Sequence, residues 1–247
     1  MEMTGNTILI TGGGSGIGRE LALRFNGLGN TVIVAGRRRD ALEETIAGRD
    51  RMHAVVLDIE DPTAITAFAK QVVTEHPALN VLINNAGIMR REDLTGTRNL
   101  RDAEETITTN LLGPIRLTDA LTDHLAGRPN AAIVNVSSGL AFVPLTGTPT
   151  YNATKAAIHS YTVSLRKQLD GRIEVIELAP PAVQTELTPG QSTREGYMPL
   201  DEFIDEVMAL FRREPTPQEI LVERVGFLRW AERDGRFDQA FDILNTH

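Results

Sequence analysis

A chain of 247 residues, with 41% hydrophobic and 23% charged residues, has the composition of a globular protein and can bury one sizeable core, so we expect a single domain over residues 1–247. The chain contains no cysteine, which excludes disulfides and thiolate metal sites. Its net charge of −8 argues against nucleic-acid and anionic-membrane partners, because both require a basic surface. Since we find neither an apolar run of membrane-spanning length nor the pattern of a signal peptide, we expect a cytoplasmic protein without a membrane partner.

Short apolar segments alternate with longer amphipathic ones as far as residue 178. Apolar segments of this kind are typical of strands buried on both faces of a parallel sheet, and the amphipathic segments are typical of the helices that cover it. We therefore predict an α/β fold of the Rossmann type, a doubly wound parallel sheet with strand order 3-2-1-4-5-6 and helices on both faces. In chain order we expect a strand at 7–10, a helix at 19–28, a strand at 31–35, a helix at 40–47, a strand at 54–57, a helix at 62–75, a strand at 81–83, a helix at 104–125, a strand at 132–136, a helix at 153–169 and a strand at 173–178.

The pattern changes after residue 178. Residues 179–199 are rich in Pro, Thr and Gly, and we predict a loop or lid there, with residues 187–199 covering the substrate. From residue 200 to residue 247 the pattern indicates helices, without a seventh strand.

A turn rich in glycine follows the first predicted strand and opens the first predicted helix. Glycines in this place let the backbone turn tightly and approach a phosphate, which then lies at the positive end of the helix. A tight turn without a ligand is the alternative. So many glycines would then weaken the packing of the turn without contributing to binding. The residues that we expect to bind a dinucleotide here are Gly12, Gly14, Ser15, Gly16, Ile17 and Gly18.

Arg37 and Arg38 follow the second predicted strand, where NAD-selective folds usually place an acid. Cations at the start of a helix oppose its dipole, so they indicate an anionic ligand, and the 2′-phosphate of NADP fits this position. A solvated basic face is the alternative, and Asp40 leaves NAD possible. Asp58 follows the third predicted strand, where it either accepts a hydrogen bond from the adenine amino group or closes a turn.

Tyr151 and Lys155 are four residues apart on a predicted helix and therefore share a face. A free tyrosine has a pKa of about 10, and a nearby ammonium should lower that pKa toward the range of useful acid–base catalysis. Ser138 lies in the loop after the fifth predicted strand, within reach of a substrate oxygen. The five histidines show no metal-ligand spacing, so we expect no metal, and we assign His159 to packing or to an interface.

These motifs, in this order, resemble those of the short-chain dehydrogenase/reductase family, in its single-domain branch. The family's cofactor turn, Thr-Gly-x-x-x-Gly-x-Gly, matches residues 11–18, and its Asn-Asn-Ala-Gly motif is present at residues 84–87. The resemblance covers residues 7–187 and implies a catalytic tetrad of Asn110, Ser138, Tyr151 and Lys155. It further implies cofactor contacts from Asp58, Ile59, Asn85, Ala86, Gly87, Tyr151, Lys155, Pro181, Val183 and Thr185, and it makes an arginine at position 37 a mark of NADP preference.

The resemblance implies an oxidoreductase that transfers the pro-S hydride between the nicotinamide and a ketone or secondary alcohol. In that reading Tyr151 is the acid–base catalyst, Ser138 polarises the reacting oxygen and Lys155 binds the nicotinamide ribose. Asn110 holds a water on the proton path from Lys155. A non-catalytic nucleotide-binding regulator, a nucleotide-sugar epimerase or dehydratase, and an NAD-dependent rather than NADP-dependent enzyme are the alternatives.

Two departures from the family pattern resemble its DltE-like oxidoreductase branch. Pro181 replaces the glycine of the usual Pro-Gly pair, which should stiffen the loop that holds the nicotinamide. The C-terminal residues 235–241 replace the usual Gly-Gly segment.

The resemblance and the apolar residues of the predicted substrate loops suggest what the chain binds. We expect an apolar or aromatic carbonyl or alcohol substrate, from Leu140, Phe142, Val143 and Leu187. We also expect a homodimer formed by the helices at 104–125 and 153–169, because family members pair through these helices. The missing seventh strand favours a dimer over a tetramer.

Overall fold

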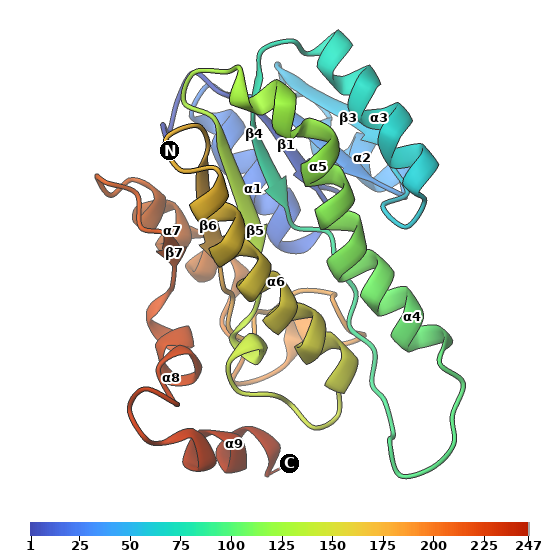
Figure 1. Cartoon of the computed structure of the whole chain (residues 1–247), viewed down its shortest axis with the longest axis vertical. Coiled ribbons are helices and arrows are strands. Elements are labelled where there is room, and N and C mark those ends of the chain that lie inside the picture. Colours follow the sequence, from blue (N-terminus) through green and yellow to red (C-terminus); the bar gives the residue numbers. More distant parts are fainter. Residues whose placement is uncertain (247) are drawn as a thin grey trace.

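The computed structural model describes residues 1–246 and shows a parallel sheet with helices on both faces (Figure 1). Within these residues the strand order is β3-β2-β1-β4-β5-β6-β7, which confirms the predicted order of the first six strands. The strands are β1 (Thr7–Thr11), β2 (Thr31–Gly36), β3 (Met52–Val56), β4 (Leu79–Asn84), β5 (Ala132–Val136), β6 (Glu174–Leu178) and β7 (Glu219–Ile220). The helices are α1 (Gly16–Gly27), α2 (Arg39–Ile46), α3 (Pro62–Glu75), α4 (Arg101–Ile107), α5 (Gly113–Ala126), α6 (Pro149–Gln168), α7 (Leu200–Phe211), α8 (Gly226–Arg229) and α9 (Phe237–Asn245).

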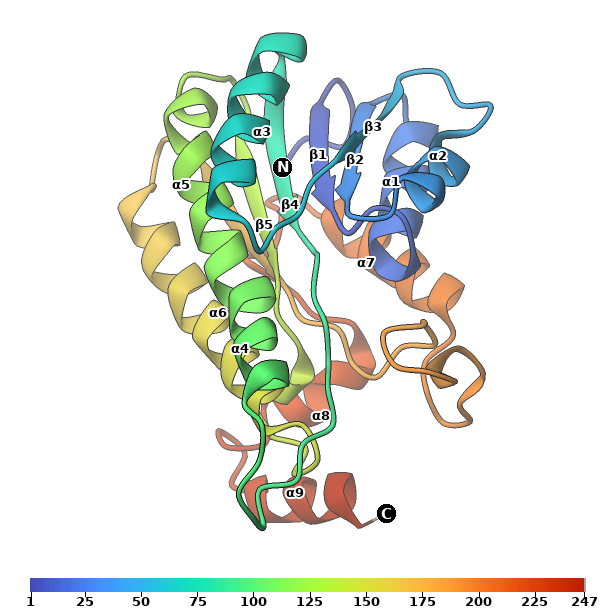
Figure 2. The same ribbon diagram turned by 90° about the vertical axis from the view of Figure 1, so that its right-hand side faces the viewer.

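Each face of the sheet carries its own hydrophobic core, because successive strand side chains point to opposite faces. Helices α1, α2 and α7 cover one face, and Phe25 and Phe203 are fully buried there. Helices α3, α5 and α6 cover the other face, where Leu117 and Leu121 are fully buried (Figure 2). The central strands β1, β4 and β5 are therefore buried on both sides, as their mainly apolar sequences predict.

The absence of a seventh strand was predicted wrongly. Residues Glu219 and Ile220 form β7 and pair in parallel with Glu177 and Leu178 of β6. A strand of two residues carries no apolar run long enough to be recognised in the sequence. A dimer was expected rather than a tetramer because the seventh strand was thought to be missing, and the presence of β7 weakens that reason.

The helix predicted at 104–125 is interrupted. Helices α4 and α5 are joined by a π-helical turn, η1 (Thr108–Leu112). A π-turn leaves the regular helical hydrogen-bond pattern and is frequent at functional sites. Asn110 lies within it.

The C-terminal segment forms a third, smaller cluster below the sheet, where α8 and α9 pack against the loop that precedes α6 (Figure 1). Val143 is fully buried against Ala231 and Ala240. Asn245 of α9 accepts a hydrogen bond from the Thr146 backbone N–H at 2.7 Å. Among residues 1–246 there is no helix with both the length and the hydropathy needed to cross a membrane.

Candidate active site

The glycine turn between β1 and α1 adopts the close-packed form that its sequence predicts. Gly12 has a φ of +69° and Gly16 a φ of +53°, a backbone region that favours glycine. A Cβ on Gly18 would lie 2.5 Å from the Gly12 carbonyl oxygen, so the start of α1 packs directly on the turn. The backbone therefore forms a cradle at the N-terminus of α1, which fits the pyrophosphate of a dinucleotide.

The Asn-Asn-Ala-Gly segment after β4 is bonded to the same turn. The hydroxyl of Thr11 accepts hydrogen bonds from the N–H groups of Asn85 (3.0 Å) and Ala86 (3.1 Å). The Asn85 side chain donates to the Thr11 carbonyl oxygen at 2.9 Å. The Asn85 side chain therefore bonds the loop after β4 to the glycine turn, and its contact with a cofactor stays a prediction.

A cleft runs along the carboxyl ends of β1, β2 and β4, where open α/β sheets bind their ligands. Eight of the predicted cofactor residues line it, namely Gly12, Gly14, Ser15, Arg37, Arg38, Ile59, Ala86 and Gly87. Eight further lining residues had not been singled out, namely Thr11, Ala35, Gly36, Ala41, Leu42, Leu57, Ile88 and Thr109. Most of the second set lie at strand ends or in the turns that follow, and that position is the signal that could have found them.

The other predicted cofactor residues lie around this cleft. A Cβ on Gly16 would lie 3.5 Å from the Thr185 side chain, so the glycine turn faces the loop after β6. Val183 and Thr185 are buried in that loop. Ile17 and Pro181 are half-buried at its edge.

The two predicted NADP-binding arginines are exposed at the rim of the cleft. Arg37 forms an ion pair with Glu60 at 3.1 Å, and Arg38 donates to the Ser15 hydroxyl at 3.3 Å. Arg38 therefore links the rim to the glycine turn. Asp58 is exposed, and its carboxylate accepts a hydrogen bond from the Glu60 N–H at 3.1 Å, which is the turn-closing geometry weighed above.

Tyr151 and Lys155 lie one turn apart on α6, and both are buried. The Lys155 Nζ lies 5.6 Å from the centroid of the Tyr151 ring and donates to the Val136 carbonyl oxygen at 2.8 Å. Burial raises the pKa of Tyr151 to about 12, and a hydrogen bond with Ser138 opposes that shift. Burial lowers the pKa of Lys155 to about 8, and the negative charge of Glu177 opposes that shift.

The pKa of Tyr151 therefore moves opposite to the expectation from the sequence. Loss of water around the phenol outweighs the hydrogen bond with Ser138, because a buried phenolate is costly. At neutral pH both groups keep their protons, and a protonated phenol is the form that can donate to a carbonyl oxygen.

Ser138 begins a short turn and is buried beside Tyr151. Its hydroxyl accepts a hydrogen bond from the Leu140 N–H at 3.1 Å, and the Gly139 N–H donates to the Pro180 carbonyl oxygen at 2.8 Å. The C-terminal segment presses on the same turn, because a Cβ on Gly139 would lie 2.9 Å from the Leu228 side chain.

Asn110 is bonded to the loop after β4 and, through its side-chain nitrogen, to the Thr154 hydroxyl of α6 at 3.3 Å. Its side-chain oxygen accepts from the Ile88 N–H at 2.8 Å, and its side-chain nitrogen donates to the Ile88 carbonyl oxygen at 2.8 Å. A Cβ on Gly87 would lie 3.3 Å from the Asn110 oxygen and 3.7 Å from the Lys155 nitrogen. The four predicted tetrad residues thus meet at the carboxyl end of β4 and β5, with Asn110 shaping the wall of the cleft.

Two of the four apolar residues predicted to contact the substrate pack elsewhere. Val143 belongs to the C-terminal cluster, and Phe142 lies under the Arg229 guanidinium at 4.5 Å and edge-on to His159 at 5.0 Å. Leu140 and Leu187 stay half-buried near the site. The sequence indicated apolar side chains but not the direction in which they point.

The loop at residues 187–199, predicted as a lid, is held by hydrogen bonds to the segment after β6. Met198 is buried, donates its N–H to the Ala182 carbonyl oxygen at 2.9 Å and accepts from the Gln184 N–H at 2.8 Å. Gln191 is also buried, and its side chain donates to the Val183 carbonyl oxygen at 2.8 Å. These contacts fix the loop to the segment that carries Thr185.

Two carboxylates near the site were missed from the sequence. Glu92 accepts hydrogen bonds from the N–H (2.9 Å) and hydroxyl (2.8 Å) of Thr150, which positions the first turn of α6. Glu177 lies on β6 and is fully buried. Glu177 stands between two apolar residues in a predicted strand, and that position is the signal that could have found it.

His159, Glu177 and Glu219 form the group, among residues 1–246, whose side-chain nitrogen and oxygen atoms lie close enough to share a cation, all within 4.8 Å of one another. Their charges are already matched, since Arg229 binds Glu219 through two hydrogen bonds of 2.8 and 2.9 Å and His159 pairs with Glu177 at 2.7 Å. A divalent ion would add to the positive charges already there. That this protein needs no metal remains a prediction.

The family model of the short chain dehydrogenases matches residues 6–196. The chain is 42% identical over its full length to the oxidoreductase DltE of Bacillus subtilis (strain 168), of which it covers 99%. It is similar to a short-chain dehydrogenase from Sphingobium yanoikuyae in complex with NADPH, with 27% identity, a TM-score of 0.80 and coverage of 95% of this chain and 94% of that chain.

It is also similar to a 3-ketoacyl-(acyl-carrier-protein) reductase from Brucella melitensis complexed with NADH, with 27% identity, a TM-score of 0.77 and coverage of 87% and 93%. The chain belongs to the short-chain dehydrogenase family, whose members are NAD(P)-dependent oxidoreductases that act on alcohol and carbonyl groups.

Proposed function

We propose that this protein is an NADP(H)-dependent oxidoreductase that interconverts a ketone and a secondary alcohol, with Tyr151 as the acid–base catalyst. The observation that carries the proposal is the buried Tyr151, Ser138 and Lys155 constellation at the end of a glycine-lined cleft. The nicotinamide, when bound, supplies or accepts the hydride. The rest of the reaction is a proton transfer, for which the chain offers its own groups.

Tyr151 donates its hydroxyl proton to the carbonyl oxygen during reduction and takes it back during oxidation. Ser138 hydrogen-bonds the same oxygen and keeps it beside the phenol. The ammonium of Lys155 stabilises the phenolate that reduction leaves behind, because an opposite charge favours the ionised form. Proton transfer of this kind contributes about 10²–10⁴-fold to the rate.

The pKa of Lys155 sets the pH range of carbonyl reduction. Lys155 carries its charge below its pKa of about 8 and loses it above that value. Reduction should therefore be fastest near neutral pH and decline as the pH rises through this range.

The cofactor lies along the cleft in this proposal. The first turn of α1 and the glycines before it hold the pyrophosphate, and Ile59 and Leu57 border the adenine. Arg37 and Arg38 bind the 2′-phosphate of NADP, for which Arg37 exchanges part of its contact with Glu60. The structural relatives with NADPH and with NADH leave both dinucleotides as candidates, and the two arginines favour NADP.

The substrate class rests on fewer residues than the sequence suggested, since Phe142 and Val143 pack elsewhere. Leu140 and Leu187 support an apolar or aromatic carbonyl compound. Arg91 borders the loop before Tyr151, because its Nη1 atom lies 3.4 Å from the place of a Cβ on Gly147. A substrate screen should therefore contain carbonyl compounds that bear a carboxylate as well as apolar ones.

A panel of aryl ketones, aliphatic ketones and oxo acids, assayed for NADPH oxidation, tests the proposal. We expect at least one carbonyl compound to be reduced with NADPH, and its alcohol product to be oxidised with NADP⁺. A protein that binds NADPH but oxidises it with no member of the panel would favour the non-catalytic nucleotide-binding alternative.

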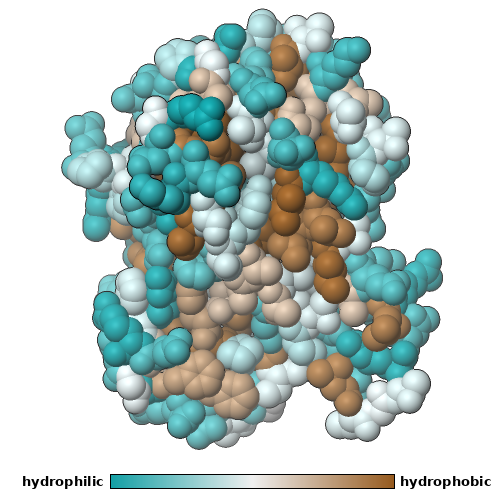
Figure 3. Space-filling model, viewed as in Figure 1, coloured by the Kyte–Doolittle hydropathy of each residue, from teal (hydrophilic) through white to brown (hydrophobic). Residues whose placement is uncertain are grey.

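We also propose a homodimer built on α4, α5 and α6. Ile107, Leu112 and Val163 are large apolar residues exposed on these helices or on the π-turn between them, and Figure 3 shows hydrophobic surface over this face of the molecule. The exposed side of α6 also carries the small residues Ala153 and Ala156, which permit close approach of a second helix. An interface of this kind is self-complementary around a two-fold axis.

Light scattering at micromolar concentration should give about twice the chain mass of 27.1 kDa. Val163→Glu places a charge in the proposed interface and should shift the protein toward the monomer, whereas Val56→Glu, on another exposed surface, should leave the dimer intact. A wild-type monomer would reject the dimer, and a tetramer would show that a further surface, such as the edge beside β7, takes part. The expected cytoplasmic location remains a prediction.

A further inference from the structure

Glu177 is a buried carboxylate that the reaction described so far does not use. It lies on β6 between Ile176 and Leu178 and is fully buried, as they are. Burying a carboxylate is costly unless hydrogen bonds and opposite charges compensate it. An apolar residue would satisfy this strand position at a lower cost, so the carboxylate calls for an explanation beyond packing.

Glu177 is bonded to both structural elements that carry the reacting groups. One carboxylate oxygen accepts from the Ser137 hydroxyl at 2.5 Å, and Ser137 directly precedes Ser138. The other oxygen pairs with the His159 Nδ1 atom at 2.7 Å, one helical turn beyond Lys155 on α6. The carboxylate therefore joins the turn after β5 to the helix of Tyr151 and Lys155.

Lys155 is bonded to the end of β5, the strand that pairs with β6. Its Nζ donates to the carbonyl oxygen of Val136, the residue before Ser137. Val136 pairs with Leu178 in the sheet, and the neighbouring pair is Asn135 with Glu177. The Lys155 ammonium is therefore bonded to Val136 of β5, and Glu177 precedes the residue of β6 that pairs with Val136.

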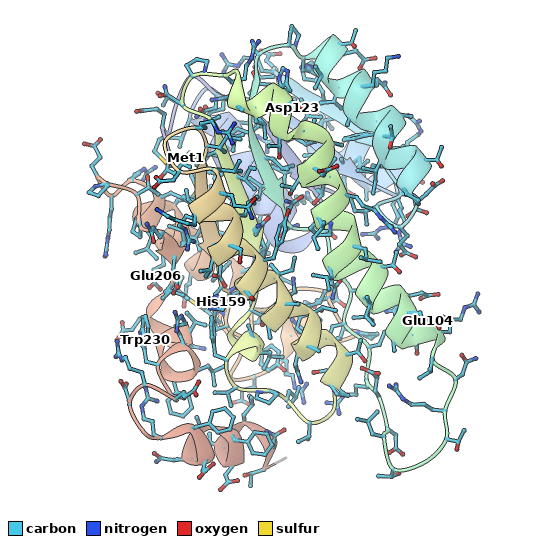
Figure 4. All side chains as sticks on the ribbon, in the orientation of Figure 1. Met1, Glu104, Asp123, His159, Glu206 and Trp230 are labelled. Atoms are coloured by element: carbon cyan, nitrogen blue, oxygen red, sulfur yellow. The ribbon has the colours of Figure 1, made fainter. Side chains whose placement is uncertain are left out.

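The remaining charged groups around Glu177 already have partners. They are His159 on α6, Glu219 on β7 and Arg229 on α8. Figure 4 labels His159 on α6 and Trp230, which directly follows Arg229 at the end of α8. Arg229 binds Glu219 through two hydrogen bonds. The hydrogen bond with Glu177 is the largest cause of the raised pKa of His159.

We propose that Glu177 is a positioning residue of the active site, whose buried carboxylate provides the counter-charge of the Lys155 ammonium and fixes the Ser138 turn against α6. The inference rests on the proposed function only for its catalytic consequence. Without the carboxylate, the buried amine would give up its proton at a lower pH, and the phenolate of Tyr151 would lose the charge that stabilises it. The effect of Glu177 on Lys155 opposes the effect of burial.

The titration of Lys155 can be measured directly, because the chain contains only three lysines, Lys70, Lys155 and Lys167. NMR of ε-¹³C-lysine in the cofactor-free protein gives three signals, and Lys155→Met identifies the one that belongs to Lys155. We expect a wild-type midpoint near 8. Glu177→Gln should lower this midpoint by about 0.5–1 pH unit, the size expected for one partly screened charge.

Glu219→Gln is the matched control, because it removes a carboxylate from the same cluster that is bound by Arg229. Its Lys155 midpoint should equal that of the wild type. Glu177→Asp keeps the charge and should restore most of the midpoint. If Glu177→Gln folds poorly, Glu177→Met serves instead, since an apolar side chain is often well tolerated in place of a buried ion.

The pH profile of kcat for carbonyl reduction provides the second readout. In Glu177→Gln the alkaline limb should move to lower pH together with the NMR midpoint. A folded Glu177→Gln or Glu177→Met protein with an unchanged Lys155 midpoint would overturn the proposal and leave Glu177 a purely structural role. A lowered midpoint in a protein that reduces no carbonyl would uphold the role of Glu177 and reject the proposed function.

Discussion

Tyr151→Phe should reduce turnover by about 10²–10⁴-fold while NADPH still binds. The substitution removes only the hydroxyl, and the ring keeps its place in the buried site. Asn110 and Lys155 are not placed to give this proton directly, because the Asn110 side chain is bonded to Ile88 and the Lys155 Nζ to the Val136 carbonyl oxygen. Turnover by the variant should be measured with chemistry as the slow step, and NADPH binding by calorimetry.

Tyr161→Phe is the matched control for this experiment, since it removes a hydroxyl from the same helix. Tyr161 is half-buried and its hydroxyl bonds to Thr118, away from the cleft. We expect this variant to keep most of the wild-type turnover. If Tyr151→Phe kept it as well, another group would have to carry the proton.

Arg37→Ala should weaken NADPH binding by roughly 10- to 100-fold, the equivalent of one charge-assisted hydrogen bond, and should change NADH binding little. The loss is selective because only NADPH carries the 2′-phosphate. Arg37 is exposed and held by Glu60 at 3.1 Å, so removing it also leaves an uncompensated carboxylate near the phosphate. Dissociation constants for both dinucleotides, measured at one salt concentration, give the selectivity.

Arg39→Ala serves as the control for the arginine cluster. Arg39 is exposed on α2 and pairs with Glu43 at 3.6 Å. It shares the general positive field of Arg37 but not its place at the cleft, so its loss should weaken NADPH far less. If the two substitutions weakened NADPH binding equally, Arg37 would act only through the general positive field. A wild type that binds NADH and NADPH equally well would refute the NADP preference.

The sheet could be predicted from the sequence because its strands are mainly apolar and alternate with amphipathic segments. Helix α3 begins at Pro62, as predicted, because Asp61 caps the N–H groups of Thr63 and Ala64. The strand β5 has its predicted bounds, because its mainly apolar segment lies between polar residues on both sides. By contrast, β7 has two residues, and no periodicity can reveal a strand so short.

The site was predicted less completely, because motifs identify residue types but not the directions of side chains. The π-turn around Asn110 lies within a continuous helical pattern, and nothing in residues 104–125 predicts the extra residue in that turn. Phe142 was expected to face the substrate, and the packing of α8 turns it toward Arg229 instead. Glu177 and His159 are 18 residues apart and meet only through the fold.

The central claim is that a hydride passes from the dinucleotide to a carbonyl carbon while this chain supplies the proton. It is tested most directly with NADPH that carries deuterium at the pro-S position of C4 and the carbonyl substrate found in the panel. We expect an alcohol with deuterium on its carbinol carbon, formed by the wild type and by Tyr161→Phe and almost not at all by Tyr151→Phe. An alcohol whose carbinol hydrogen comes from water, or one formed equally well by Tyr151→Phe, would contradict it.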